Sequence, residues 1–373
     1  MAKGAYIGVN GVAKKIKESY IGVDNVAKKI DQIYIGVEGI ARLYFDSNSS
    51  SGGTLTYYGR ITNLSASVYK LAATTIGNYA LFAGGWPGNY DFPTVVDAYN
   101  TSLTKSTNAT LSKGRSSLAA TTVGGYALFG GGASSSPITA VDAYDASLTG
   151  STPTALSIKR EDLAATTVGN YALFGGGKND SKYYNVVDAY DASLTRTKPT
   201  ALSETKYELA ATTIGNYALF GGGSTGTNSA VVDAYNTSLT RSTVTALSKA
   251  RYRLAATTVG NYALFGGGYS SYSSVVDAYN ASLTRSIPTA LSVARYCLSA
   301  TTVGNYALFG GGTGNKISSV VDAYDTSLTR STPTELFKPR YMSAATTVGN
   351  YALFGGGYDD RFCLEFVDAY KII

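Results

Sequence analysis

LAATTVGNYALFGGG (residues 163–177) is one copy of a segment that returns along the chain at a nearly constant spacing. Its tyrosine recurs at Tyr79, Tyr126, Tyr171, Tyr217, Tyr262, Tyr306 and Tyr351, with intervals of 47, 45, 46, 45, 44 and 45 residues. A second peptide, VDAY, keeps step with it from Asp97 to Asp368. Tandem copies at this period are typical of solenoids and propellers, so the repeat determines the fold.

Each repeat contains four short runs with the composition of β-strands. LAATTV is followed by a Gly-Asn pair that suits a two-residue turn, and then by YALFGGG. VVDAY comes next across a loop of changing length, and runs such as SLTRSIPTAL (residues 282–291) come last. Val, Thr, Tyr and Phe dominate, and no run has a helical apolar period. Seven units of four antiparallel strands predict an all-β, seven-bladed β-propeller.

The two ends of the repeat region predict how the ring closes. Residues 54–71, TLTYYGRITNLSASVYKL, align with the fourth strand and its exit in later repeats. The last repeat stops at VDAYKII, one strand short of a full unit. We therefore expect residues 54–64 to pair with the Val367–Tyr370 strand as the outer strand of the seventh blade, which leaves no open sheet edge.

Residues 1–45 form a different module. YIGVNGVAKKI, YIGVDNVAKKI and YIGVEGIARLY start at Tyr6, Tyr20 and Tyr34, and each predicts a hairpin with a turn at Asn10-Gly11, Asp24-Asn25 or Glu38-Gly39. Lone hairpins are marginal in water, so this module is expected to attach to a partner. The attachment residues would be Tyr6, Ile7, Tyr20, Ile21, Tyr34 and Ile35. Residues 46–53, rich in Ser and Gly, predict a linker to the propeller of residues 54–373.

The repeat resembles the kelch repeat. A basic residue precedes the first strand, glycines end the second (Gly175–Gly177), and Tyr followed by Asp ends the third (Tyr190–Asp191). The Trp that kelch repeats carry near the fourth strand is replaced by Thr, Arg or Ser. The resemblance, which covers residues 54–373, implies a kelch-like propeller.

Composition narrows the possible functions. The sequence has no histidine, which excludes Ser-His and Cys-His nucleophile pairs, His-ligated metals and histidine-dependent copper chemistry. Cys297 and Cys363 are expected to be unpaired thiols. We expect no enzymatic activity and no cofactor, although a paired-carboxylate hydrolase without a recognised motif stays open. A net charge of +6 spread over 373 residues indicates no nucleic-acid partner, and no apolar run of about 18 residues predicts membrane insertion. The start of the chain lacks a signal-peptide core.

The repeats also predict where binding occurs. In a propeller the turns after the first and third strands share one face, and here they are nearly invariant (VGN, and DASLT or NTSLT). The loops after the second and fourth strands share the other face and vary from blade to blade. We call these the uniform face and the variable face. Diverse loops on a rigid frame are typical of a binding surface.

Two residue classes mark the variable face. Aromatic candidates for ligand binding are Trp86, Tyr90, Phe92, Tyr183, Tyr184, Tyr269, Tyr272, Tyr358 and Phe362, with Tyr207, Tyr252, Tyr296 and Tyr341 in the inner connections. They suit sugar stacking or a protein hot spot, or they pack on neighbouring loops. Basic candidates precede the first strand: Arg115, Arg160, Lys206, Arg251, Arg295 and Arg340. They either ring the mouth of the central channel and attract an anionic ligand, or pair locally with acidic groups.

The two modules together resemble tail-fibre and receptor-binding proteins of phages, prophages and phage-tail-like bacteriocins of Gram-positive bacteria. The resemblance rests on the 14-residue YIGV hairpin motif before a variable repeat domain. It implies that residues 1–45 bind tail or baseplate proteins and that the propeller binds a host-surface glycan, teichoic acid or surface protein. It also implies a location in the virion tail or an extracellular tail-like particle, assembled in the host cytoplasm. The alternative functions are a structural baseplate or collar component and a kelch protein–protein adaptor, and a homo-oligomer stays open as a partner.

Overall fold

The computed structural model describes residues 6–9, 12–15, 20–23, 26–29, 32–37, 40–46 and 53–373. The chain divides into two compact units, residues 1–54 and 55–373. Among the described residues, no helix is long and apolar enough to cross a membrane.

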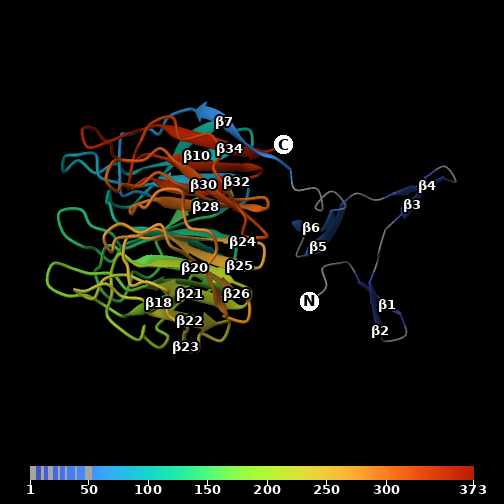
Figure 1. Cartoon of the computed structure of the whole chain (residues 1–373), viewed down its shortest axis with the longest axis horizontal. Coiled ribbons are helices and arrows are strands. Elements are labelled where there is room, and N and C mark those ends of the chain that lie inside the picture. The colour runs from blue at the N-terminus through green and yellow to red at the C-terminus, as the bar shows by residue number, and fades with distance from the viewer. Residues whose placement is uncertain are drawn as a thin grey trace. The chain divides into compact units, whose positions relative to one another are not determined.

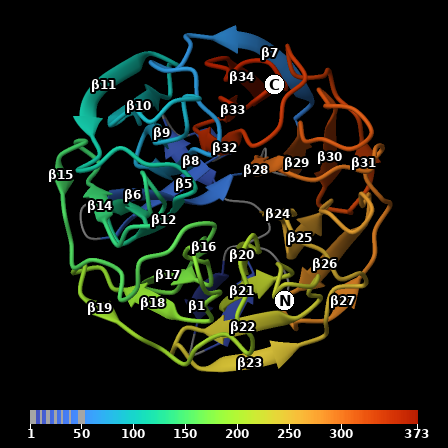
Figure 2. The ribbon, with the colours of Figure 1, turned by 90° about the vertical axis from the view of Figure 1, so that its left-hand side faces the viewer.

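Residues 55–373 form seven four-stranded antiparallel sheets that stand around a common axis (Figure 2). The innermost strands are β8 (Ala72–Ile76), β12 (Ala119–Val123), β16 (Ala164–Val168), β20 (Ala210–Ile214), β24 (Ala255–Val259), β28 (Ser299–Val303) and β32 (Ala344–Val348). The second strands are β9 (Tyr79–Ala83), β13 (Tyr126–Gly130), β17 (Tyr171–Gly175), β21 (Tyr217–Gly221), β25 (Tyr262–Gly266), β29 (Tyr306–Gly310) and β33 (Tyr351–Gly355). The predicted seven-bladed propeller is confirmed.

The outer half of each blade is more variable in length. The third strands are β10 (Val95–Asn100), β14 (Val141–Tyr144), β18 (Val187–Tyr190), β22 (Val232–Asn236), β26 (Val276–Asn280), β30 (Val321–Asp325) and β34 (Val367–Ile372). The fourth strands are β11 (Lys105–Thr110), β15 (Gly150–Ser151), β19 (Arg196–Thr197), β23 (Arg241–Val244), β27 (Arg285–Ser286), β31 (Arg330–Ser331) and, for the last blade, β7 (Leu55–Ile61). We number the blades 1 to 7, from β8–β11 to β32–β34 with β7.

The ring closes as the sequence predicts. β7, at the start of the unit, pairs antiparallel with β34 at the end of the chain, from Ile61 opposite Val367 to Leu55 opposite Ile372 (Figure 1). The Tyr57 hydroxyl donates a 2.5 Å hydrogen bond to Asp368 Oδ1 across this pair. The last blade therefore has its fourth strand, which covers the otherwise open edge of β34.

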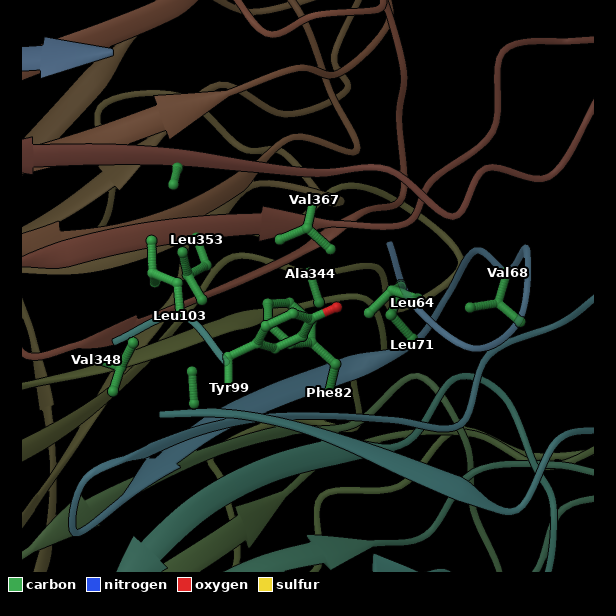
Figure 3. Close-up of a cluster of buried hydrophobic side chains, with 12 residues drawn as sticks. Leu64, Val68, Leu71, Phe82, Tyr99, Leu103, Ala344, Val348, Leu353 and Val367 are labelled. Atoms are coloured by element: carbon green, nitrogen blue, oxygen red, sulfur yellow. The ribbon is translucent and has the colours of Figure 1, made fainter. Parts of the chain in front are cut away.

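Apolar side chains fill the space between neighbouring blades. Between blades 7 and 1, Phe82 and Tyr99 pack edge to face with ring centroids 5.9 Å apart, beside Leu353 and Val367 (Figure 3). The Tyr99 hydroxyl donates to the Thr62 carbonyl. The same arrangement recurs around the ring, because every blade carries the same Phe and Tyr.

Small residues let the strands and blades approach closely. A side chain at Gly175 would place its Cβ 2.8 Å from Phe220 of the next blade, so that ring would have to shift. On the inner strands, the Thr166 hydroxyl lies 2.8 Å from the Thr213 hydroxyl of the next blade. Equivalent pairs are Thr75–Thr346, Thr121–Thr167, Thr212–Thr258, Thr257–Thr302 and Thr301–Thr347. These threonine hydroxyls therefore satisfy one another between neighbouring blades.

The other unit contains three hairpins that are described by their backbone strands. β1 (Tyr6–Val9) pairs with β2 (Val12–Lys15), β3 (Tyr20–Val23) with β4 (Val26–Lys29), and β5 (Gln32–Val37) with β6 (Ile40–Asp46). The three predicted antiparallel pairs are therefore present. The turn residues, linker residues 47–52 and the side chains of the predicted attachment residues lie outside the described part.

Candidate functional site: the variable face and its axial cup

The two faces of the propeller have the predicted division of loops. On the uniform face the turn after each first strand packs against the turn after the third strand of the next blade, as Gly169 does against Thr237. On the variable face the loop leaving each second strand forms a β-bridge with the connection entering the first strand, as Tyr69 does with Trp86. Each face thus gathers the pairs of connections that the sequence assigned to it.

The uniform turns are explained by their own hydrogen bonds. Asp145 Oδ1 accepts hydrogen bonds from the amides of Ser147 and Thr149, at 2.8 and 2.9 Å. Leu148 between them has a φ of 63°, a left-handed conformation that this capped turn stabilises. The same bonds recur where Asn replaces Asp, as at Asn236. Their invariance is therefore structural.

The aromatic candidates on the variable face differ in exposure. Tyr90, Phe362, Tyr183, Tyr269 and Tyr272 are exposed, with Tyr90 at 81% and Phe362 at 65%. Trp86, Phe92, Tyr184 and Tyr358 are half-buried. These side chains are available to a partner to very different degrees, and the loop tips carry the most accessible ones.

Many of these aromatic side chains pack on one another, which is the packing alternative derived from the sequence. Trp86 stacks on Tyr69 at 5.7 Å, and Tyr69 contacts Tyr358, which contacts Tyr341. A second cluster joins Tyr252, Tyr269, Tyr272 and Tyr296, with centroids 5.1 to 5.9 Å apart. A third pairs Tyr183 with Tyr207 at 4.7 Å, and Lys178 Nζ lies 4.9 Å from the centre of the Tyr207 ring. Held in clusters, the rings form preorganised aromatic surfaces.

The six basic candidates do not ring the channel mouth, and the idea that they attract an anionic ligand there is corrected. Arg115, Arg160, Lys206, Arg251, Arg295 and Arg340 are all 0% exposed. Arg160 extends across its own blade, donates to the Phe174 carbonyl and pairs with Asp188 at 2.8 Å. The same local pairing holds for the other five, with Asp142, Asp233, Asp277, Asp322 and Asp368.

The basic residues therefore pair with acidic groups of their own blades. The aspartate of each VDAY peptide from Asp142 onward is the partner in these ion pairs. Burial lowers the pKa of the Arg160 guanidinium, and the charge of Asp188 opposes that effect. In blades 3 to 6 an outer arginine joins from the fourth strand, as Arg196 does at 3.1 Å from Asp188. Blade 1 has Lys105 in this place and blade 2 has Gly150.

A different set of residues lines the mouth of the channel on the variable face. One residue per blade, two positions before the first strand, forms a ring: Lys70, Ser117, Asp162, Glu208, Arg253, Cys297 and Met342. Each has a φ between 51° and 56°. The amide of each ring residue donates to the carbonyl of the ring residue in the preceding blade, at 2.9 to 3.0 Å, and the seven bonds close on themselves. The backbone is therefore constant while the side chain differs in every blade.

The ring residues surround a cavity of about 270 Å³, which we call the axial cup. Leu71, Leu118, Leu163, Leu209, Leu254 and Leu298, with Ser343 in the last blade, line it below the ring. Two carboxylates lie side by side in blades 3 and 4: Asp162 pairs with Lys178 at 3.3 Å, and Glu208 pairs with Arg253 at 2.8 Å. Burial and the charge of Asp162 raise the pKa of Glu208.

The axial cup was missed in the interpretation of the sequence. Two positions separate the nearly constant basic residue from the nearly constant leucine, and the signal was that the second of them differs in all seven repeats. Cys297 belongs to this ring, where burial raises the pKa of its thiol to about 12. Both it and Cys363 are free thiols, as expected.

Comparison with known proteins establishes the fold. Neither a family model nor a curated protein matches the sequence. Among solved structures, YjhT, a kelch-repeat protein, is similar at 13% identity with a TM-score of 0.56, over 69% of this chain and 95% of its own. At this identity the likeness shows the fold alone. Residues 55–373 are a seven-bladed, kelch-like β-propeller.

Proposed function

We propose that this chain is a non-enzymatic receptor-binding protein of a phage or phage-tail-like particle. In this proposal residues 1–45 attach to the tail or baseplate, and the variable face of the propeller binds a ligand on the host surface. The proposal rests on the resemblance of the hairpin motif and on one structural observation. The fold requires the uniform face to be uniform, whereas aromatic side chains and a cavity gather on the face that differs from blade to blade.

The observation favours recognition over a purely structural role. A decorating component needs no diversity at a position whose backbone is the same in every blade. Binding energy at interfaces is concentrated in a few large anchors, and preformed aromatic clusters supply such anchors at a low entropic cost. Trp86 illustrates this, because it is stacked on Tyr69 and its indole N–H donates to the Asn89 carbonyl at 2.8 Å.

Adsorption of the purified full chain to host cells or cell-wall fractions tests the proposal. Trp86→Ala combined with Tyr184→Ala should weaken binding at least tenfold, since loss of one anchor costs ~2 kcal/mol or more. Ser147→Phe and Ser282→Phe, on exposed turns of the uniform face, are matched controls that should bind normally. Binding that depends on the turn variants and ignores the aromatic ones would contradict the assignment of the face. Absence of any adsorption would favour the decorating component.

Attachment through the hairpins is tested separately. A fusion of residues 1–45 to an unrelated soluble protein should be incorporated into assembled particles, because two-stranded hairpins need a partner surface for stability. The same fusion with Tyr6, Tyr20 and Tyr34 replaced by Ser should be excluded from the particles. Equal incorporation of both fusions would show that these tyrosines do not make the attachment.

A further inference from the structure

A second set of residues, which we call the rim, lies outside the lining of the axial cup and is aromatic in most blades. The residue directly before each ring residue forms this rim: Tyr69, Ser116, Glu161, Tyr207, Tyr252, Tyr296 and Tyr341. Each rim residue is held by a β-bridge to the loop that leaves the second strand, as Tyr252 is to Tyr269. The five tyrosines are half-buried, so each retains accessible ring surface. Rings that are fixed in this way can cover an apolar ligand face while their hydroxyls stay in water.

The charged groups of the cup are balanced. Among the residues that line it, Lys70 and Arg253 supply two positive charges and Asp162 and Glu208 supply two negative ones, so their formal sum is zero. A site for a phosphodiester polymer needs net positive potential to attract it. The cup has no such excess, which disfavours teichoic acid as its occupant.

The arrangement of donors and acceptors fits a hydroxylated ligand. Asp162 and Glu208 place carboxylate oxygens, which accept hydrogen bonds, in adjacent blades. Arg253, next to them, and Lys70 donate. Cys297 and Met342 lie between these two cations around the ring and add an apolar sector. A hydroxyl group donates and accepts at once, so a ring of hydroxyls can use both kinds of partner while its C–H face lies on the aromatic rim.

The size of the cup limits the ligand further. Its volume of about 270 Å³ is slightly below the ~300–1,000 Å³ of sites that enclose drug-sized molecules. Because the ring of seven backbone hydrogen bonds fixes the diameter, the cup cannot widen without breaking the inner ends of the blades. A folded protein segment does not fit such a site, whereas one sugar ring does.

We propose that the axial cup binds one uncharged pyranose residue of a host-surface glycan. This step rests on the proposed function and adds the ligand class and the place where it binds. Asp162 and Glu208 accept hydrogen bonds from the sugar hydroxyls, Arg253 and Lys70 donate to them, and the rim tyrosines cover the ring. The aromatic loops farther out contact the following residues of the glycan.

Ligand binding to the full chain by saturation-transfer NMR and calorimetry tests the proposal. The probes are the methyl pyranosides of glucose, galactose, mannose and N-acetylglucosamine, with a synthetic glycerol phosphate oligomer beside them. We expect at least one of the four sugars to bind and the oligomer not to bind. Failure of all four sugars, or binding of the oligomer in the cup, would overturn the proposal.

Variants place the binding in the cup. Glu208→Gln should lower the affinity for the sugar at least tenfold, because one of its two acceptor oxygens becomes an amide. Met342→Trp fills the cup from its apolar side without removing an ionic group, and should abolish binding even if Glu208→Gln proves unstable. Asp180→Asn, an exposed carboxylate of the same face that does not line the cup, is the matched control. Sugar binding that survives Met342→Trp would place the sugar elsewhere and overturn the proposal.

Adsorption to host cells separates this inference from the proposed function. If Met342→Trp abolishes both sugar binding and adsorption, both proposals are supported. If cells still adsorb Met342→Trp but not the Trp86 and Tyr184 variant, the chain is a receptor-binding protein and the axial inference is wrong. If the sugar binds in the cup and the wild-type protein adsorbs to no cells, the site stands and the proposed function fails.

Discussion

Asp188 is the most informative residue to perturb within a blade, because its carboxylate holds two cations. Arg160 Nη2 lies 2.8 Å from Oδ2, and Arg196 Nη1 lies 3.1 Å from Oδ1. The Arg160 side chain is 0% exposed, whereas that of Arg196 is 23% exposed. Asp188→Val therefore leaves a buried guanidinium without a counter-charge. Arg160→Met leaves the aspartate paired with the outer arginine.

The two changes should differ in cost by several kcal/mol. Removing one partner of a buried ion pair costs ~3–5 kcal/mol. Loss of the acceptor for the Ser157 amide, which donates to Asp188, adds about 1 kcal/mol. For Arg160→Met the surviving pair and the similar volume limit the cost to ~1–2 kcal/mol. Blade 1 already accommodates Val68, 3% exposed, at the position of Arg160.

Thermal melts of the full chain, followed by circular dichroism, measure the difference. At about 2 °C per kcal/mol, Asp188→Val should lower the Tm by ~8–12 °C and Arg160→Met by ~2–4 °C. The double variant should be more stable than Asp188→Val alone, because the unpaired cation is gone. If Arg160→Met is as damaging as Asp188→Val, or if the double variant regains nothing, the carboxylate is not the centre of this network.

Three further predictions concern closure, thiol reactivity and blade 2. Deleting residues 1–64 removes β7 and should cause aggregation, whereas deleting residues 1–45 should leave a soluble propeller; identical size-exclusion profiles would contradict the closure. Iodoacetamide at pH 8 should modify Cys363 and spare Cys297 in the folded protein, because a pKa of about 12 leaves only about one Cys297 side chain in ten thousand as the reactive thiolate. Peptide mass spectrometry measures the modification of each cysteine, and faster modification of Cys297 would contradict the prediction. Blade 2 has a cavity of about 330 Å³ beside Gly150, where four other blades place an arginine. Gly150→Arg should fill this cavity and raise the Tm by ~2–4 °C, and an unchanged Tm would show that the cavity cannot accept the arginine.

The blades and their closure could be predicted because both depend on local patterns. Alternating strand runs, Gly-Asn turns and a constant period define four strands per unit, and these signals agree with one another. The match between residues 54–71 and the later exits predicts the β7–β34 pair without any knowledge of the structure. The same comparison of repeats separated the uniform face from the variable one.

The partners of the six basic candidates could not be predicted residue by residue, because they depend on the direction of side chains across a blade. Arg160 and Asp188 are 28 residues apart, and nothing in that spacing shows that the arginine turns outward across its blade toward the third strand. The axial ring was missed for a related reason. A left-handed backbone at residues as different as Lys70 and Met342 has no sequence signal, since glycine is the usual marker of positive φ.

In a chain of near-identical repeats, recurrence alone does not distinguish structure from function. A basic residue before the first strand recurs because its charge is buried and must be paired. The aspartate of three blades has only one cation: blade 1 has Val68 before its first strand, blade 2 has Gly150 on its fourth strand, and in blade 7 the Tyr57 hydroxyl takes the place of the outer arginine. The ring of the axial cup shows the opposite relation. There the hydrogen bonds and φ values repeat in every blade while the side chains do not, from Lys70 to Met342. Because the backbone would accept one residue type in all seven places, the fold does not explain the diversity, and we propose ligand recognition as its cause.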